Sequence, residues 1–247
     1  MRTIFIVILL FITQFGIAQT NFINNGIITY ERRVSQFKIN QKESDEGEAF
    51  WKEEMMKVMT KTLSDVFTLN FTSDQSYYHL AKENAENKYM FGNLKPVETD
   101  YIAQNFSTET TNLLKSVFEN QYQINDSIKK FEWKITGEVR TIAGFECKKA
   151  VTKICDSVVV VAFYTDQILV KGGPENFNGL PGMIMGLAIP RLASTWFATK
   201  VELNNNPIII PSTKGKKGSF RDMNKEITKG MSNWGDMGAS IVWIANL

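Results

Sequence analysis

Cysteine and histidine are scarce in this 247-residue chain, which has two cysteines and one histidine. Two cysteines exclude a disulfide-dense scaffold and a four-cysteine zinc site, and one histidine excludes any site that needs two imidazoles. Glycine and proline, with 16 and 6 residues, are too few for a collagen-like or low-complexity chain. The 28 basic and 26 acidic residues give a net charge of only +2, so no basic field favours a nucleic-acid partner.

Long apolar runs are absent as well, except near the start of the chain, where an almost unbroken run extends from Ile4 to Ile12. This run is too short to span a bilayer, and Gly16 and Ala18 are small residues at the positions that signal peptidase recognises. We therefore expect a signal peptide over residues 1–18 and a periplasmic or secreted protein without a membrane span after cleavage. No cysteine follows the cleavage point, so a bacterial lipoprotein is not expected.

Alternating apolar and polar residues predict a protein made mainly of antiparallel strands. The first strand covers Ile27 to Val34, and a hairpin follows in which 67–71 and 78–80 flank a polar turn. Short connections favour an antiparallel meander, because a parallel crossover needs a dozen or more residues. Later strands are expected near Tyr122 and at 101–106, 133–140, 145–154, 157–165, 183–189 and 196–203.

Apolar residues also recur at helical spacing over 46–63 and predict one amphipathic helix. We expect this helix to pack on a curved meander sheet or half-barrel and to cover its central strand, Val158 to Phe163, which is apolar on both faces. The domain prediction is a single β-rich domain over 19–247. Its core lies at about 26–203, and its C-terminal tail at 204–247 contains a weak helix.

The two cysteines, Cys147 and Cys155, are predicted not to form a disulfide. If residues 155–156 form a two-residue hairpin turn, Cys147 pairs with Tyr164 on the next strand. The cysteines are then separated by roughly 26 Å at ~3.3 Å per residue. A disulfide needs Cα atoms closer than about 7 Å.

The stretch from Lys171 to Met185 is rich in glycine and asparagine and contains the segment Gly179-Leu180-Pro181-Gly182. Proline presets φ near −65° and glycine accepts positive φ, so this segment fits a type II turn that starts the strand 183–189. Two interpretations stay open. The segment is either a structural corner or a partner-binding loop formed by Asn176, Asn178, Gly179, Leu180, Pro181 and Gly182. It lacks the Lys-Ser/Thr ending of a phosphate-binding loop, and no cofactor is expected.

The hexapeptide Gly179-Leu180-Pro181-Gly182-Met183-Ile184, together with the segments at 144–150 and 163–165, resembles the GLPGLI family of Bacteroidetes. The likeness covers about residues 26–203. The resemblance implies an exported, β-rich protein of uncharacterised function that is often encoded near TonB-dependent outer-membrane receptors. It supplies no catalytic residues.

No catalytic or metal-binding constellation stands out in the sequence, so we expect a non-enzymatic envelope accessory or binding protein. Its expected partner is a periplasmic or outer-membrane protein or peptide, in association with a TonB-dependent transport system. Two alternatives stay open. Copper handling would use the thioethers of Met55, Met56 and Met59, whose spacing also suits core packing. A hydrolase would use carboxylates such as Asp100 and Asp166, but no spacing selects a pair.

Overall fold

The computed structural model describes residues 22–36, 60–89, 94–155 and 157–247. The predicted signal peptide at 1–18 lies outside the described residues, as do Met55, Met56 and Met59. Within the described ranges, no helix has both the length and the apolar character that crossing a membrane requires.

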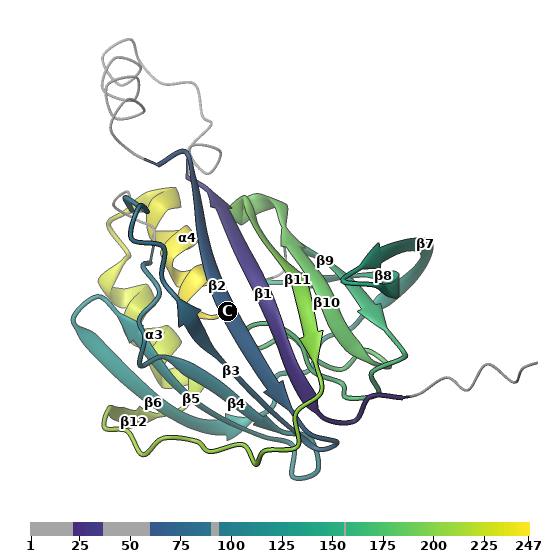
Figure 1. Ribbon diagram of the computed structural model, residues 1–247. Helices are drawn as coiled ribbons and strands as arrows, with labels where there is room; N and C mark the ends of the chain where they lie inside the picture. Colours follow the sequence, from purple (N-terminus) through teal and green to yellow (C-terminus); the bar gives the residue numbers. More distant parts are fainter. Residues whose placement is uncertain (1–21, 37–59, 90–93, 156) are drawn as a thin grey trace, which may run out of the picture.

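Twelve strands form one curved sheet that does not close on itself (Figure 1). In chain order they are β1 (Gly26–Ser35), β2 (Thr62–Phe71), β3 (Gln75–Lys82), β4 (Tyr101–Asn105), β5 (Thr110–Val117), β6 (Asn120–Ser127), β7 (Lys134–Ile142), β8 (Phe145–Ile154), β9 (Val158–Thr165), β10 (Met183–Ile189), β11 (Ser194–Glu202) and β12 (Lys216–Gly218). A short 3₁₀ helix, η2 (Pro190–Leu192), joins β10 to β11. The prediction of a mainly antiparallel β protein is confirmed.

Strand β1 joins two meanders into one sheet. The spatial order is β12-β6-β5-β4-β3-β2-β1-β11-β10-β9-β8-β7. Strand β1 pairs with β2 on one side and with β11 on the other, so the first described strand connects the meander β2–β6 to the meander β7–β11. Neighbouring strands are antiparallel except at one end of the sheet, where β12 runs parallel to β6.

Alternating burial explains why the predicted first strands form. Ile28 and Tyr30 of β1 are fully buried, and Thr29 between them is half-buried. Their partners across the ladder are Leu69 and Phe67 of β2, which are buried too. The apolar side chains at every second position of the two strands therefore meet on one face of the sheet, as the sequence pattern predicts.

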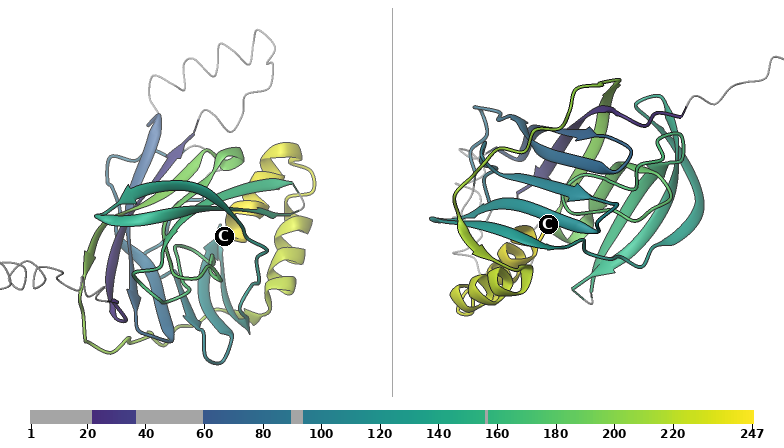
Figure 2. Two further views of the ribbon diagram at one scale, coloured as in Figure 1. Left: turned by 90° about the vertical axis from the view of Figure 1, so that its right-hand side faces the viewer. Right: turned by 90° about the horizontal axis from the view of Figure 1, so that it is seen from below.

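Two helices near the end of the chain, α3 (Phe220–Gly230) and α4 (Gly235–Ala245), pack beside the sheet near β6 and β12 (Figures 1 and 2). Helix α3 begins with a capping box, in which the side chain of Ser219 accepts from the Asp222 amide and the Asp222 carboxylate accepts from the Ser219 amide. Met223, Ile227 and Ile241 of these helices are buried in the main core.

The expectation that an N-terminal helix covers the sheet is therefore wrong. Most of the predicted range, 46–59, lies outside the described residues, and Thr62 and Leu63 belong to β2. The helices come instead from the region that was predicted as a tail. Strand β9 is also less enclosed than expected, because Val159 is 37% exposed and uninterrupted burial begins only at Ala162.

The β8–β9 hairpin has a longer turn than the predicted one. Ile154 pairs with Val158, and Lys148 rather than Cys147 pairs with Tyr164, so the register differs by one residue. Cys155 lies in the turn and has a left-handed φ of +48°. Neither cysteine forms a disulfide, which confirms that part of the prediction.

Candidate functional site

The loop between β9 and β10, residues 166–182, lies within the concave side of the curved sheet (Figure 2). Its middle residues, from Gly172 to Asn178, are all buried. The six predicted binding residues divide into two groups: Gly179 and Pro181 are exposed, and Asn176, Asn178, Leu180 and Gly182 are buried. The loop is therefore an internal part of the fold, and its side chains form walls of cavities.

The Gly-Leu-Pro-Gly turn differs from the expected type II turn. The amide of Gly182 donates to the Leu180 carbonyl at 2.8 Å, so the turn closes over Pro181 alone. The Met183 amide donates instead to the carbonyl of Ile168 at 2.9 Å. Gly182 has a φ of +145°, and a Cβ there would collide with the Thr165 carbonyl oxygen. Glycine is therefore required by close approach to β9 as well as by its backbone angle.

The two predicted asparagines tie the loop to neighbouring segments. The backbone amide and the Nδ2 of Asn176 both donate to the Leu247 carbonyl, at 3.0 and 2.5 Å. The Nδ2 of Asn178 donates to the carbonyls of Lys129 and Asn176, at 3.2 and 2.8 Å. These contacts fix the loop against the end of α4 and the β6–β7 connection. The Oδ1 of Asn176 is buried and has no partner among the described residues.

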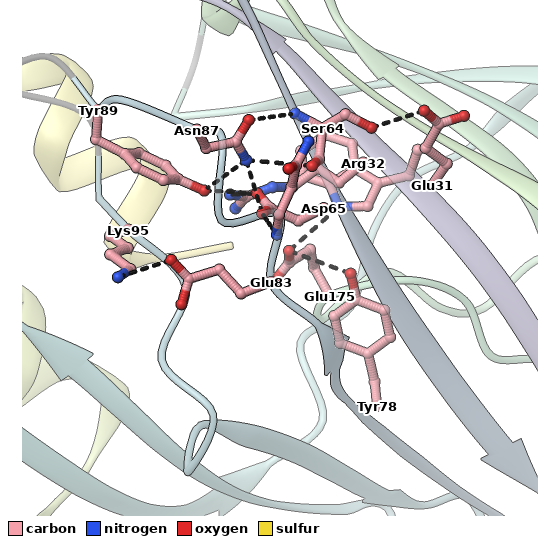
Figure 3. Close-up of polar contacts among 12 residues, drawn as sticks. Glu31, Arg32, Ser64, Asp65, Tyr78, Glu83, Asn87, Tyr89, Lys95 and Glu175 are labelled. Carbon is pink, nitrogen blue, oxygen red and sulfur yellow. Dashed lines mark hydrogen bonds and ion pairs between the residues drawn. The ribbon is translucent and has the colours of Figure 1, made fainter. Parts of the chain in front are cut away.

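Glu175 lies next to Asn176 but belongs to a separate polar site (Figure 3). Its Oε1 accepts from the Trp196 Nε1 at 3.2 Å and, more weakly, from the Tyr78 hydroxyl at 3.5 Å. Its Oε2 lies 3.8 Å from the Nζ of Lys115. Glu175, Tyr78 and Lys115 border a cavity of about 50 Å³, here called the Glu175 cavity. That volume admits water or one small ligand group, since a water molecule takes up about 30 Å³.

Asp100 lines the same cavity. It accepts from the backbone amide and hydroxyl of Ser116, at 2.9 and 2.7 Å. Burial raises the pKa of Asp100 above its ordinary value, and the nearby Glu175 adds to the effect, against these hydrogen bonds and the positive charge of Lys115. Asp166, the other carboxylate considered from the sequence, does not line this cavity. It forms an ion pair with Lys148 at 2.7 Å.

A buried cluster around Asp65 supports one wall of the Glu175 cavity (Figure 3). Asp65 accepts from Arg32 at 3.1 Å, from the Tyr89 hydroxyl at 2.6 Å and from the Asn87 amide at 2.9 Å. Burial, followed by the hydrogen bond to Asp65, raises the pKa of Tyr89. Arg32 also lies over the ring of Phe67, 5.2 Å from its centroid. The cluster thus holds Arg32 at the cavity wall with its charge compensated.

A larger cavity of about 470 Å³ lies where the loop, the β6–β7 connection and the two helices meet. It is here called the Trp243 cavity. Its volume falls within the roughly 300–1,000 Å³ typical of small-ligand sites. Its lining contains three aromatic rings, three asparagines and three lysines: Phe131, Phe177, Trp243, Asn176, Asn224, Asn246, Lys129, Lys130 and Lys153.

Several of these groups are held in place by the fold. The rings of Phe131 and Phe177 stack with centroids 5.0 Å apart. The guanidinium of Arg191 lies 4.5 Å from the centroid of Trp243 and orients the indole. The Nδ2 of Asn246 donates to the Oδ1 of Asn224 at 3.1 Å. Apolar rings and fixed amide groups therefore share one cavity.

Sequence reasoning missed both Glu175 and Trp243. Glu175 had a usable signal, because it is the charged residue in the stretch 172–182, which otherwise consists of glycine, proline, asparagine and apolar residues. Trp243 had no such signal, since a tryptophan in an apolar stretch near the end of the chain is as consistent with core packing as with a binding site.

Among the described residues, no three His, Cys, Asp or Glu side chains lie close enough together to hold a metal ion. The copper hypothesis depends on Met55, Met56 and Met59, which are outside those residues.

Comparison with known proteins links the chain to a glycan-processing family. The profile of the family described as "N-glycanase peptide, N-terminal domain" matches residues 39–203. No curated protein matches. The solved structure of PNGF-II in a C2 crystal form has a TM-score of 0.52 and 18% identity, over 89% of this chain and 33% of that one. The structure of PNGF-II in a P21 crystal form has a TM-score of 0.52 and 17% identity, over 86% of this chain and 34% of that one. The chain thus spans about a third of PNGF-II, and at this identity the likeness shows the fold alone.

These findings correct two expectations. The GLPGLI assignment is wrong, because the profile that matches most of the chain is that of the N-glycanase domain. The TonB association and the uncharacterised status depended on that assignment and are not supported. The expectation of a non-enzymatic protein is also contradicted, since the matching family is defined by a domain of an enzyme.

Proposed function

The chain belongs to the family of N-glycanase N-terminal domains, and from this we propose that it is an exported protein that binds N-linked glycans during their enzymatic processing. The Trp243 cavity is the proposed binding site. The partner is then a glycoprotein or a glycopeptide. The apolar segment from Ile4 to Ile12 supports export, which would bring the protein into contact with extracytoplasmic glycoproteins.

The residue types that line the Trp243 cavity are the main support for this proposal. A pyranose ring presents C–H groups on its faces and hydroxyl groups around its rim. Phe131 and Trp243 offer apolar ring surface to such faces. Asn224 and Asn246 offer amide donors and acceptors to hydroxyl groups. The cavity, at about 470 Å³, has room for a small saccharide unit, whereas the Glu175 cavity, at about 50 Å³, does not.

Calorimetric titration of the purified exported protein with a biantennary N-glycan tests the proposal. A saturable heat of binding that the corresponding unglycosylated peptide does not produce is the expected result. Absence of binding by both the free glycan and an intact glycopeptide would contradict the proposal.

Two variants locate the site. Trp243→Ala removes a ring from the cavity wall and should weaken binding at least tenfold, whereas Trp234→Ala, in the turn before α4 and outside the lining, should not. Because Trp243 also packs against Arg191, a second variant separates binding from folding. Thr228 is an exposed lining residue of α3, so Thr228→Phe should obstruct the cavity while leaving the core intact.

Hydrolysis at the Glu175 cavity is a second candidate function. The observation that favours it is the presence of Asp100, whose raised pKa favours the protonated form, in one cavity with the Glu175 carboxylate. Only one small group of a substrate would enter this cavity. Release of glycan from a glycopeptide, detected by mass spectrometry, should be lost in Asp100→Asn and retained in Asp166→Asn. A wild-type protein that releases no glycan would exclude this candidate without affecting the binding proposal.

A further inference from the structure

Lys129 in the β6–β7 connection is a partly buried cation without a carboxylate partner among the described residues. Its Nζ donates to the backbone carbonyl of Asn246 at 2.6 Å and lies 4.1 Å from the ring centroid of Phe220. No ion pair of Lys129 occurs among the described residues. A buried charge is ordinarily paired, because removal from water is costly unless an opposite charge or several hydrogen bonds compensate it.

The charged side chains in the lining of the Trp243 cavity all have one sign. Lys129, Lys130 and Lys153 line it, and no aspartate or glutamate side chain does. Lys130 reaches away to Glu109, with which it forms an exposed ion pair at 3.1 Å. The ammonium group of Lys153, an exposed residue of β8, has no ion-pair or hydrogen-bond partner among the described residues. Two of the three ammonium groups are therefore available to a ligand in the cavity.

We propose that the Trp243 cavity selects acidic saccharides, whose anionic group pairs with Lys129 and Lys153 while the sugar ring packs against the aromatic wall. The inference depends on the proposed glycan-binding function and specifies its substrate class. The anionic group is a carboxylate, as in a sialylated glycan, or a phosphate ester. Both would supply the opposite charge that Lys129 lacks.

The lowered pKa of Lys129 agrees with a cation that has no opposite charge beside it in the described part of the chain. Burial, and then the positive charge of Lys115, lower the pKa of Lys129 to about 8. Cys155 and Asp126 act in the opposite direction, but more weakly. The Asp126 carboxylate is already engaged, since it accepts from the backbone amides of Phe220 and Ser127. An anion in the cavity would raise the pKa of Lys129 again and stabilise its charged form.

Paired glycans separate this inference from the function on which it depends. The purified exported protein is titrated with a sialylated biantennary glycan, its desialylated counterpart and a phosphorylated high-mannose glycan, at low and at physiological salt. We expect at least one acidic glycan to bind tenfold or more tightly than the neutral glycan, with a preference that weakens in salt. The stronger of the two acidic glycans identifies the anionic group.

Lysine variants place the effect in the cavity. Lys129→Met and Lys153→Met should reduce the affinity for the acidic glycan toward that for the neutral glycan, which itself should change little. Lys129→Arg should retain the preference, and Lys82→Met, on the exposed end of β3, is the matched control. Equal affinity for neutral and acidic glycans would overturn the inference and leave glycan binding intact. Binding of none of the glycans would overturn the proposed function itself.

Discussion

Glu175 and Trp196 are joined by a buried hydrogen bond of 3.2 Å between the indole Nε1 and the carboxylate. Glu175 has a left-handed φ of +55°, which is uncommon for a residue other than glycine. Its side chain enters the Glu175 cavity, and the next residue, Asn176, lines the Trp243 cavity. One unusual backbone position thus directs adjacent side chains into two different cavities.

The bond between Glu175 and Trp196 should be measurable as a coupling energy. Glu175→Ala and Trp196→Phe should each lower the free energy of unfolding, with a coupling of about 1–3 kcal/mol, because the bond is buried and its acceptor is a carboxylate. Urea unfolding of the wild type, both single variants and the double variant completes the cycle. The effects of Glu175→Ala and the control Lys82→Met should be additive. A coupling near zero for the first pair would contradict the contact.

Gly182→Ala should destabilise the protein more than Gly179→Ala. Both glycines have positive φ, +145° and +89°, but a Cβ at Gly182 would meet the backbone of Thr165, whereas nothing lies within 4 Å of one at Gly179. The expected losses are roughly 2–5 kcal/mol for Gly182→Ala and about 1 kcal/mol for Gly179→Ala. Thermal and urea unfolding compare the two. Equal losses would mean that the backbone angle alone matters.

Lys129→Met should stabilise the protein near neutral pH. The folded-state pKa of Lys129, about 8, lies below the ordinary value of 10.5, so the cost of burying its charge is fully present below pH 8. The cost is relieved as the pH rises from 8 toward 10.5 and the folded protein releases the proton. The expected gain in unfolding free energy at pH 7 is roughly 1–2 kcal/mol, after loss of the Asn246 and Phe220 contacts.

Urea unfolding of Lys129→Met at pH 7 and pH 9.5, with Lys82→Met as the control, measures this gain and its decline. A gain that increases with pH would contradict the assignment of a lowered pKa. Since the variant should be more stable, any loss of acidic-glycan binding in it cannot be attributed to unfolding.

The two cysteines should differ in reactivity. Cys147 is fully buried, and burial raises the pKa of its thiol to about 11, whereas Cys155 is exposed in the β8–β9 turn. A thiol reagent at pH 8 should therefore modify one cysteine in the native protein and two in denaturant. Peptide mapping should place the native modification at Cys155. Rapid modification of Cys147 without denaturant would contradict its burial.

Local patterns predicted strands such as β1, β2 and β3 because alternate residues of each are buried on one face. Strand β5 was missed for a physical reason: its adjacent residues Leu113 and Leu114 are both buried, but in different apolar clusters. Alternation disappears where both faces are covered. Helix α4 was missed because its N-cap residue, Trp234, makes no side-chain cap and the helix contains glycines at 235 and 238.

The candidate sites depend on contacts between distant parts of the chain, which no local pattern encodes. Asn176 binds the carbonyl of a residue 71 positions away, and Tyr78 contacts a residue 97 positions away. The glycine-rich loop was recognised as unusual, but its burial was not. An asparagine in a loop has the same local pattern whether it points to solvent or lines a cavity.

The late position of α3 and α4 in the chain has a consequence for the order of assembly. During synthesis, strands β1 to β12 all emerge before these helices, so the sheet residues are present while the Trp243 cavity still lacks a wall. A ligand of that cavity binds only a chain in which the last segment has docked, and mass action then favours the docked form. Ligand binding would therefore report completion of folding and would protect the C-terminal helices from proteases that act on partly assembled chains.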